Sequence, residues 1–223
     1  VERSRGLGDV YKRQGKDLQT LRSDKIFRHS LGESQDDDIL VYEEKDETFS
    51  TFVYPSKSRE YIMIGSSSTM ASEYRFLSSK TPLEPFKIIQ KRERGLEYSP
   101  SHVGDMFYIS TNIDESTNFK LVKTPISSTE KSNWKDVIPH REDVLIEDTD
   151  FFNDFMVIGE RSNGLLKIRI KSWDGKEDYY LDLSSQFDYD NETYSASIGY
   201  NPNFQTNILR YNFTSLTLSL IHI

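Results

Sequence analysis

Short segments rich in aromatic and β-branched residues recur along this 223-residue sequence at a nearly regular interval. Such side chains pack well on a pleated sheet, and short runs of them separated by polar turns are typical of strands. The apolar centres of four segments, Met63, Phe107, Met156 and Leu209, are spaced by 44, 49 and 53 residues. A period of this length, with about four short strands in each unit, predicts the blades of a β-propeller.

The predicted fold class is therefore all-β, a partial β-propeller with about four blades of four-stranded antiparallel sheets. The expected strands lie at 50–54, 60–65, 71–77, 105–111, 118–123, 154–159, 165–172, 195–200 and 207–213. No segment keeps a helical period beyond about ten residues, which argues against an α/β fold. A β-sandwich stays open as the alternative, because any all-β chain has evenly spaced hairpins. The polar segments 81–85 and 127–133 are expected to link one blade to the next.

The two ends of the sequence differ in character from the rest. Residues 1–14 show no hydrophobic period, and residues 218–223 form an apolar stub without turn or cap chemistry. Both stretches resemble read-through of adapter DNA, so we expect them to be non-native flanks of a propeller fragment at 15–217. The alternative is a disordered basic N-terminus and a final strand. Under the first interpretation the natural protein continues in both directions.

Charge and composition exclude several classes of function. The chain carries 28 Lys and Arg against 36 Asp and Glu, for a formal net charge of −8. Leaving out four basic and two acidic side chains in 1–14 brings the charge of 15–217 to −10. This acidity argues against a nucleic-acid partner, and the short apolar runs argue against a membrane span. The absence of cysteine excludes disulfides, thiol nucleophiles and thiolate metal sites. The compartment stays open between cytoplasm, which we favour, and periplasm.

The search for catalytic motifs yields no complete constellation. The segment Gly65-Ser66-Ser67-Ser68-Thr69 is the nearest approach to the G-x-S-x-G turn of an α/β-hydrolase. It lacks the second glycine and a following helix, so we interpret it as a polar hairpin turn. His29, His102 and His140 have no second histidine at ligand spacing, which argues against a metal site.

Acidic clusters are the richest polar feature of the sequence. Asp36, Asp37 and Asp38 offer oxygen ligands for a cation, but adjacent carboxylates point in different directions, which favours a solvated loop. Glu43 and Glu44 form a carboxylate pair, yet neighbours on a strand face opposite sides. A propeller glycosidase would need an inward-facing pair of carboxylates that the sequence does not identify. We assign no catalytic, cofactor-binding or metal-binding residue.

Several phrases in a fixed order are far more specific than any single motif. They are YEEKD (42–46), LEYS (96–99), NFKL (118–121), IPHRE (138–142) and LRYNFTSLT (209–217). In this combination the sequence from about Asp24 to Thr217 resembles the prolyl oligopeptidase family of serine peptidases, in particular its oligopeptidase B (protease II) branch. The match stops at Thr217, where the apolar stub begins.

The resemblance implies a larger parent enzyme. That enzyme would have a seven-bladed propeller over an α/β-hydrolase domain, with Ser, Asp and His following later in the chain in that order. It would cleave short peptides after Lys or Arg, so the implied partners are short cationic peptides and a C-terminal catalytic domain in cis. This chain alone is expected to be inactive. The main competing hypothesis is a stand-alone propeller that binds a ligand or protein; residues 15–35 look too polar to supply its closing strand.

Overall fold

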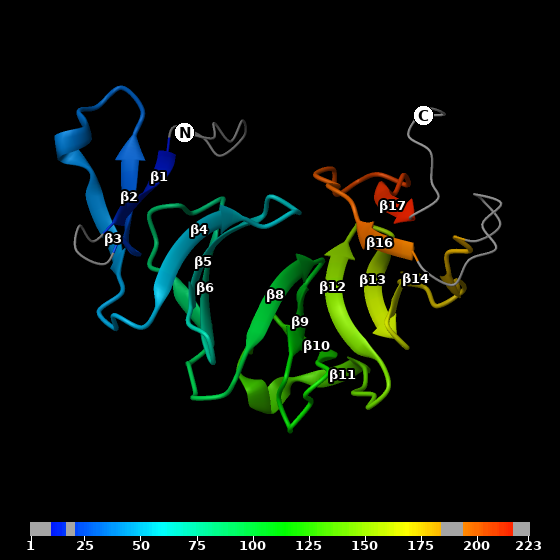
Figure 1. The fold of residues 1–223 in the computed structure, drawn as a ribbon. Helices are drawn as coiled ribbons and strands as arrows, with labels where there is room; N and C mark the ends of the chain where they lie inside the picture. The colour runs from blue at the N-terminus through cyan, green and yellow to red at the C-terminus, as the bar shows by residue number, and fades with distance from the viewer. Residues whose placement is uncertain (1–9, 17–20, 184–193, 216–223) are drawn as a thin grey trace.

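In this computed structural model the chain forms antiparallel sheets that stand side by side in an arc (Figure 1). The structure describes residues 10–16, 21–183 and 194–215. Within this part, three four-stranded sheets lie between a three-stranded sheet and a two-stranded sheet. We number these sheets blades one to five in chain order. None of the helices in the described part is long and apolar enough to cross a membrane.

The strands of each blade follow one another in sequence. Blade one contains β1 (Val10–Lys16), β2 (Ser23–Ser30) and β3 (Ile39–Glu43), with the 3₁₀ helix η1 (Gln35–Asp37) before β3. Blade two contains β4 (Ser50–Pro55), β5 (Tyr61–Ser67), β6 (Ser72–Ser78) and β7 (Lys87–Gln90). Blade three contains β8 (Tyr98–Val103), β9 (Met106–Thr111), β10 (Lys120–Pro125) and, after the 3₁₀ helix η2 (Lys131–Asn133), β11 (Lys135–Ile138). Blade four contains β12 (Leu145–Phe151), β13 (Phe155–Ser162), β14 (Leu165–Ser172) and β15 (Asp178–Tyr180), and blade five β16 (Tyr194–Ile198) and β17 (Tyr211–Ser215).

This architecture confirms the predicted all-β fold of four-stranded antiparallel blades. Three blades are complete in the described part of the chain, and the partial sheets on either side continue the same pattern. The middle strands were predicted well, because their apolar alternation and turn residues are local properties. Of the expected strands, 165–172 has the same bounds as β14, whereas 207–213 overlaps β17 only at its end.

Several expectations about the connecting segments are wrong. The segments 81–85 and 127–133 connect the third strand to the fourth strand within blades two and three, not one blade to the next. Residues 15–35 do contain a strand, because β2 lies there and pairs with both β1 and β3 in blade one. That they supply no closing strand for the last blade stays a prediction. The strand β1 also crosses the boundary expected after residue 14. Whether residues 1–14 are native stays a prediction, and the stub 218–223 lies outside the described residues.

The first strands of blades three and four escaped prediction because they are unusually polar. The strand β8 reads Tyr-Ser-Pro-Ser-His-Val, and β12 carries Glu147, Asp148 and Asp150. Together with β4 they line the concave side of the arc, and all three arrows end at the same side (Figure 1). Each is held by its pairing to the more apolar second strand of its own blade. Pairing therefore compensates for weak strand propensity at these positions.

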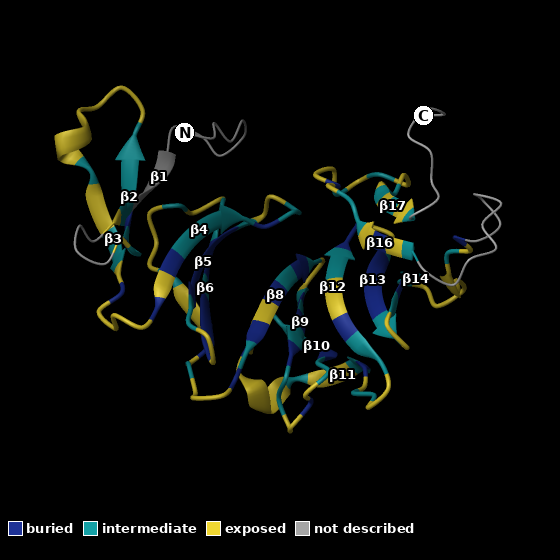
Figure 2. Ribbon diagram, viewed as in Figure 1, coloured by how far each residue is buried: buried dark blue, intermediate teal, exposed yellow. Residues whose placement is uncertain are grey.

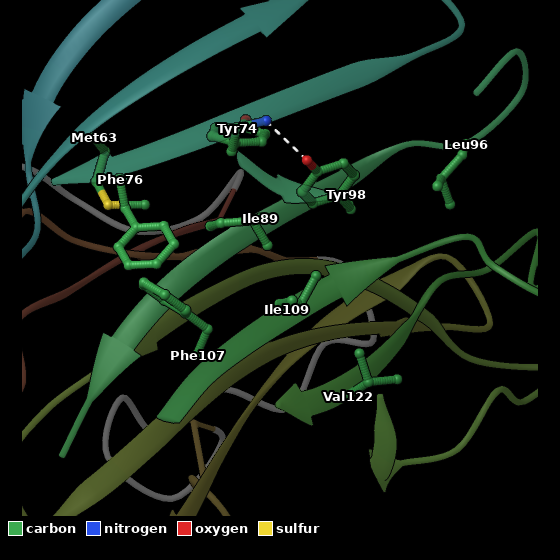
Figure 3. Packing of buried hydrophobic residues seen from close by; sticks show 9 residues of the cluster. All are labelled: Met63, Tyr74, Phe76, Ile89, Leu96, Tyr98, Phe107, Ile109 and Val122. Carbon is green, nitrogen blue, oxygen red and sulfur yellow. Dashed lines mark hydrogen bonds between the residues drawn. The ribbon is translucent and has the colours of Figure 1, made fainter. Parts of the chain in front are cut away.

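Buried residues concentrate in the middle strands (Figure 2). In β5 and β13 five successive residues are buried, whereas β3 and β17 contain no fully buried residue. Blades two and three meet through a cluster that we call the aromatic seam. Its buried members are Met63, Tyr74, Phe76, Ile89, Leu96, Tyr98, Phe107, Ile109 and Val122 (Figure 3). Burial of each large side chain there contributes about 1.5–3 kcal/mol.

The polar end of one aromatic residue is satisfied inside this seam. The Tyr98 hydroxyl accepts a hydrogen bond from the backbone N–H of Tyr74 at 2.8 Å (Figure 3). The same hydroxyl donates to the carbonyl of Gln90 at 2.5 Å. Burial raises the pKa of Tyr98 far above its usual value, so it stays protonated and can donate. Tyr98 thus ties β6 and β7 of blade two to β8 of blade three.

Blades one and two meet through a different set of contacts, which we call the polar seam. Arg92 donates to Glu44 at 2.5 Å and to Glu73 at 3.2 Å, and its guanidinium stacks over the ring of Phe49 at 3.9 Å. The Tyr42 hydroxyl donates to Glu44 at 2.7 Å. Burial opposes the charge of Glu44, but the bonds from Arg92 and Tyr42 outweigh it and leave the pKa of Glu44 below its usual value.

Candidate functional site

Three blades converge at the turn between β4 and β5, on the concave side of the arc. A cavity of about 70 Å³ lies beneath the turn. Its walls come from blades two, three and four, and comprise Tyr54, Ser56, Lys57, Met63, Pro100, Ser101, His102, Asp150 and Phe151. A cavity of this size with several polar walls suits a few ordered water molecules rather than a peptide side chain. We take the turn and its partners as the candidate site.

The turn holds its shape through its own hydrogen bonds. The backbone N–H of Ser56 donates to the carbonyl of Tyr61 at 2.8 Å, and the N–H of Arg59 donates to the carbonyl of Ser56 at 2.9 Å. Arg59 has a φ of +65°, a left-handed conformation that tightens the turn. The Ser56 hydroxyl accepts from the Tyr61 N–H at 3.1 Å. These bonds place Lys57 and Ser58 at the tip of the turn.

Lys57 reaches past blade three to the first strand of blade four. Its ammonium lies 2.5 Å from an oxygen of Asp150 in β12 and 3.4 Å from the ring centroid of Phe152. About four fifths of both charged side chains are shielded, with 21% and 20% exposed. Burial lowers the pKa of Lys57 and raises that of Asp150, while the contact between the two groups opposes both shifts. The pair is therefore poorly solvated and depends on its own geometry.

Ser58 binds the first strand of blade three through His102. Its hydroxyl lies 2.7 Å from Nδ1 of His102, whose Nε2 lies 2.7 Å from the carbonyl oxygen of Gly104. Because the carbonyl only accepts, Nε2 carries the proton and Nδ1 accepts from Ser58. Burial lowers the pKa of His102, which favours this neutral imidazole. The ring packs against Tyr61 with the centroids 4.6 Å apart.

A hydrogen bond from a serine hydroxyl to a histidine is also found in catalytic pairs of nucleophile and general base. Here His102 is 3% exposed, and its ring packs in T-shaped contact with both Tyr61 and Phe107. That packing leaves little room for a scissile bond beside the imidazole, and the lowered pKa makes it a weak base. The geometry suits a structural bridge between the turn and β8.

The remaining histidines and the acidic triplet lie elsewhere. His29 Nδ1 lies 2.6 Å from Asp38, so β2 and the segment after η1 are brought together, while Asp36 and Asp37 stay exposed in η1. His140 Nε2 accepts from the N–H of Asn118 at 3.4 Å. Over the described residues no group of three or more acidic or histidine side chains is arranged to hold a metal ion.

The serine-rich segment and the glutamate pair take structural positions. Ser66 is fully buried in β5 and contacts the hydroxyl of Tyr42 at 3.1 Å. Ser67 ends β5, and Ser68 closes the hairpin to β6 through a bond from its N–H to the carbonyl of Ala71. Glu43 and Glu44 lie in different surroundings. Glu43 is near Lys25 at the surface, whereas Glu44 is buried in the polar seam.

A wider groove of about 550 Å³ lies where blade four faces blade five. Phe155, Trp173 and Tyr179 line it together with several carboxylates. In the described part of the chain β17 pairs only with β16. The groove lies between blade four and the segment that connects β16 to β17.

Comparison with protein families gives one match that spans nearly the whole chain. The profile described as the prolyl oligopeptidase N-terminal beta-propeller domain matches residues 10–218. This range extends beyond both ends of the expected body 15–217, by five residues at the start and one at the end.

Two curated relatives carry peptidase names. Dipeptidyl aminopeptidase BI from Pseudoxanthomonas mexicana is 39% identical over 202 residues, which cover 91% of this chain and 27% of that protein. Protease 2 from Moraxella lacunata is 29% identical over 192 residues, which cover 86% of this chain and 26% of that protein. The chain thus spans about a quarter of the length of these relatives.

Solved structures show the same fold. Oligopeptidase B from Trypanosoma brucei, in a closed form with covalently bound antipain, matches with a TM-score of 0.82 and 25% identity. The match covers 93% of this chain and 30% of that one. Oligopeptidase B from Leishmania major matches with a TM-score of 0.84 and 24% identity, over 94% of this chain and 30% of that one.

Proposed function

Because this chain belongs to the prolyl oligopeptidase family as part of its N-terminal β-propeller domain, we propose that it is the substrate-gating portion of a serine endopeptidase of the oligopeptidase B type. The observation that carries the proposal is the profile match over residues 10–218, because it identifies this propeller among the many unrelated ones. The likeness to two oligopeptidase B structures supports the same branch.

The proposed role follows from the shape of the blades. The sheets stand in an arc around a concave side (Figure 1). In the proposed full-length protein, further blades close this arc into a ring, and its narrow central channel admits a short extended peptide and excludes a folded protein. Domain closure over a bound peptide also removes water and completes a catalytic site. In this proposal the nucleophile, the base and the oxyanion hole lie in a part of the protein outside this chain, so the 223 residues alone hydrolyse no peptide.

The proposed substrates are short peptides cleaved after Lys or Arg. The excess of acidic side chains, which gives a formal charge of −8, supports this choice because it attracts cationic peptides over long range. Such steering weakens as salt screens the charges. For the full-length protein, kcat/KM toward an Arg peptide should fall as ionic strength rises, and an unchanged value would remove steering from the proposal.

One relative supports a second candidate activity. The 39% identical protein is named a dipeptidyl aminopeptidase, an enzyme that removes dipeptides from a free N-terminus. A substrate pair separates the two activities. The full-length protein should hydrolyse an N-terminally blocked peptide ending in Arg-aminomethylcoumarin if it is an endopeptidase. It should require the unblocked dipeptide form if it is a dipeptidyl aminopeptidase.

The central experiment compares this chain with the full-length protein on the blocked Arg substrate. We expect turnover by the full-length protein, none by the 223-residue chain, and loss of turnover after treatment with a serine-directed fluorophosphonate. Turnover by the purified chain itself would contradict the gating role. A full-length protein that cleaves neither the blocked nor the free substrate would instead favour a propeller that only binds its ligand.

A further inference from the structure

The turn between β4 and β5 makes contacts that the order of the blades does not require. Neighbouring blades in a propeller pack face to face, so each blade is expected to contact the next one along the chain. Lys57 instead joins blade two to blade four across 93 residues of sequence. From the same turn, Ser58 joins blade two to blade three through His102. One short turn thus contacts both of the blades that follow it.

The contacts are built into the fold rather than spread over the surface. The Lys57 ammonium is held by Asp150 on one side and by the face of the Phe152 ring on the other. Phe152 is fully buried in the core between blades four and five. A lysine placed over a buried ring and beside a shielded carboxylate loses much of the freedom of a surface side chain. The contact therefore fixes the distance between two blades that do not pack directly side by side.

We propose that the β4–β5 turn is a clasp that locks blades two, three and four into one rigid body through Lys57–Asp150 and Ser58–His102. The clasp lies near the ends of β4, β8 and β12, on the concave side of the arc (Figure 1). The clasp would fix the relative positions of the blades in this chain, and this proposal does not depend on the proposed gating function. If that function is correct, any opening of the passage takes place outside the segment from β4 to β12.

A second interblade ion pair provides a matched control. The ammonium of Lys131, in η2 of blade three, lies 2.5 Å from a carboxylate oxygen of Glu93. Glu93 belongs to the segment that follows blade two, so this pair also joins two blades. Both side chains are exposed, by 41% and 45%, and such surface pairs contribute little. The substitution Lys131→Met therefore removes the same charge from the chain without touching the clasp.

The chain contains no cysteine, so spin labels can be placed at chosen positions without other changes. We suggest Lys80→Cys on blade two and Lys167→Cys on blade four, which are both exposed. Pulsed electron paramagnetic resonance then gives the distribution of distances between the blades. Four labelled proteins are compared: the parent chain, Lys57→Met, Lys57→Arg and Lys131→Met. Circular dichroism checks that each is folded.

We expect a narrow distribution in the parent chain and in Lys131→Met. In Lys57→Met the distribution should broaden and shift to longer distances, and Lys57→Arg should restore most of the parent's width because it keeps a cation beside Asp150. An unchanged distribution in folded Lys57→Met would overturn the proposal, since the seams alone would then hold the blades. If Lys57→Met does not fold, Asp150→Asn is measured with the same labels. A broadened distribution in this variant supports the clasp, and an unchanged one overturns it.

Discussion

Blades two and three meet through aromatic rings, whereas blades one and two meet through an arginine held between two glutamates. The aromatic seam gains stability from area removed from water, which depends little on the exact direction of each contact. In the polar seam, desolvation opposes the charges of Arg92, Glu44 and Glu73, and it is offset by the bonds of Arg92 together with those from Tyr42 to Glu44 and from Arg75 to Glu73. The two seams should therefore respond differently to substitution. The aromatic seam should lose stability in proportion to the side-chain volume that is removed. The polar seam should lose stability when one member of an ion pair is removed and the other stays buried.

The largest expected effect comes from the aromatic seam. Phe107 is fully buried and packs edge-on against Phe76 with the ring centroids 5.0 Å apart. Phe107→Ala removes that ring and leaves a cavity, which should lower the free energy of unfolding by about 3–5 kcal/mol. Urea unfolding followed by tryptophan fluorescence measures the loss. A loss below about 1 kcal/mol would show that the seam closes around the cavity or that the blades unfold independently.

The second largest loss of stability should come from the polar seam, when one charged partner is removed and the others stay. Arg92→Met leaves the carboxylates of Glu44 and Glu73 buried without their shared cation, which should cost about 2–4 kcal/mol. The double variant Glu44→Gln/Arg92→Met removes one charge of each sign, and we expect it to be more stable than Arg92→Met alone. Equal stability of the single and double variants would mean that the seam is not a coupled network.

Acid should weaken the polar seam more than the aromatic one. Burial opposes the charge of Glu44 and Glu73, but bonds involving Arg92 outweigh it, so the pKa of each carboxyl is lower folded than unfolded. Their stabilising contribution is present above the unfolded pKa and is lost as the pH falls through the folded value. We expect a loss of about 1 kcal/mol on acidification through this range.

Other carboxyls change stability in the opposite direction. Burial raises the pKa values of Asp148 and Asp150, so protonation of these groups favours the folded state. The measurement is therefore a difference: urea midpoints of the parent chain and of Glu44→Gln are compared at neutral pH and over a series of pH values that falls well below the usual glutamate pKa. The parent should lose more stability than the variant, and equal losses would contradict the assignment.

The smallest effect on stability should come from the surface ion pair that joins blades two and three. Lys131→Met removes the contact to Glu93, where both side chains are more than two fifths exposed. Because water and salt already screen this pair, the free energy of unfolding should change by less than about 0.5 kcal/mol. A larger loss would mean that the aromatic seam between blades two and three also depends on its polar rim.

Much of the fold could be predicted from sequence alone because its determinants are local. The strands expected at 154–159 and 165–172 correspond to β13 and β14. Between them lies Asn163-Gly164, a dipeptide typical of tight hairpin turns, and its residues adopt φ values of +51° and +82°. The first strands β8 and β12 could not be found in this way. Proline and carboxylates dominate their local sequence, and only the neighbouring strand makes them part of a sheet.

The candidate site was less accessible to sequence reasoning. His102 was singled out, but its partner Ser58 lies 44 residues away in a segment that reads only as a turn. No sequence pattern connects Lys57 to Asp150, because a lone lysine in a polar turn is ordinary. In the sequence, Glu44 is half of a carboxylate pair with Glu43, yet in the structure Glu44 forms an ion pair with Arg92.

The sequence by itself determined the class of fold, the middle strands of blades two, three and four, and the family, because strand alternation, turn chemistry and ordered phrases are written along the chain. Tertiary structure alone decided which charges meet. Lys57 and Asp150, or Glu44 and Arg92, contact each other only after the curvature of successive blades has brought distant turns together. Apolar burial depends on a residue's own character, whereas an ion pair depends on where another residue comes to lie.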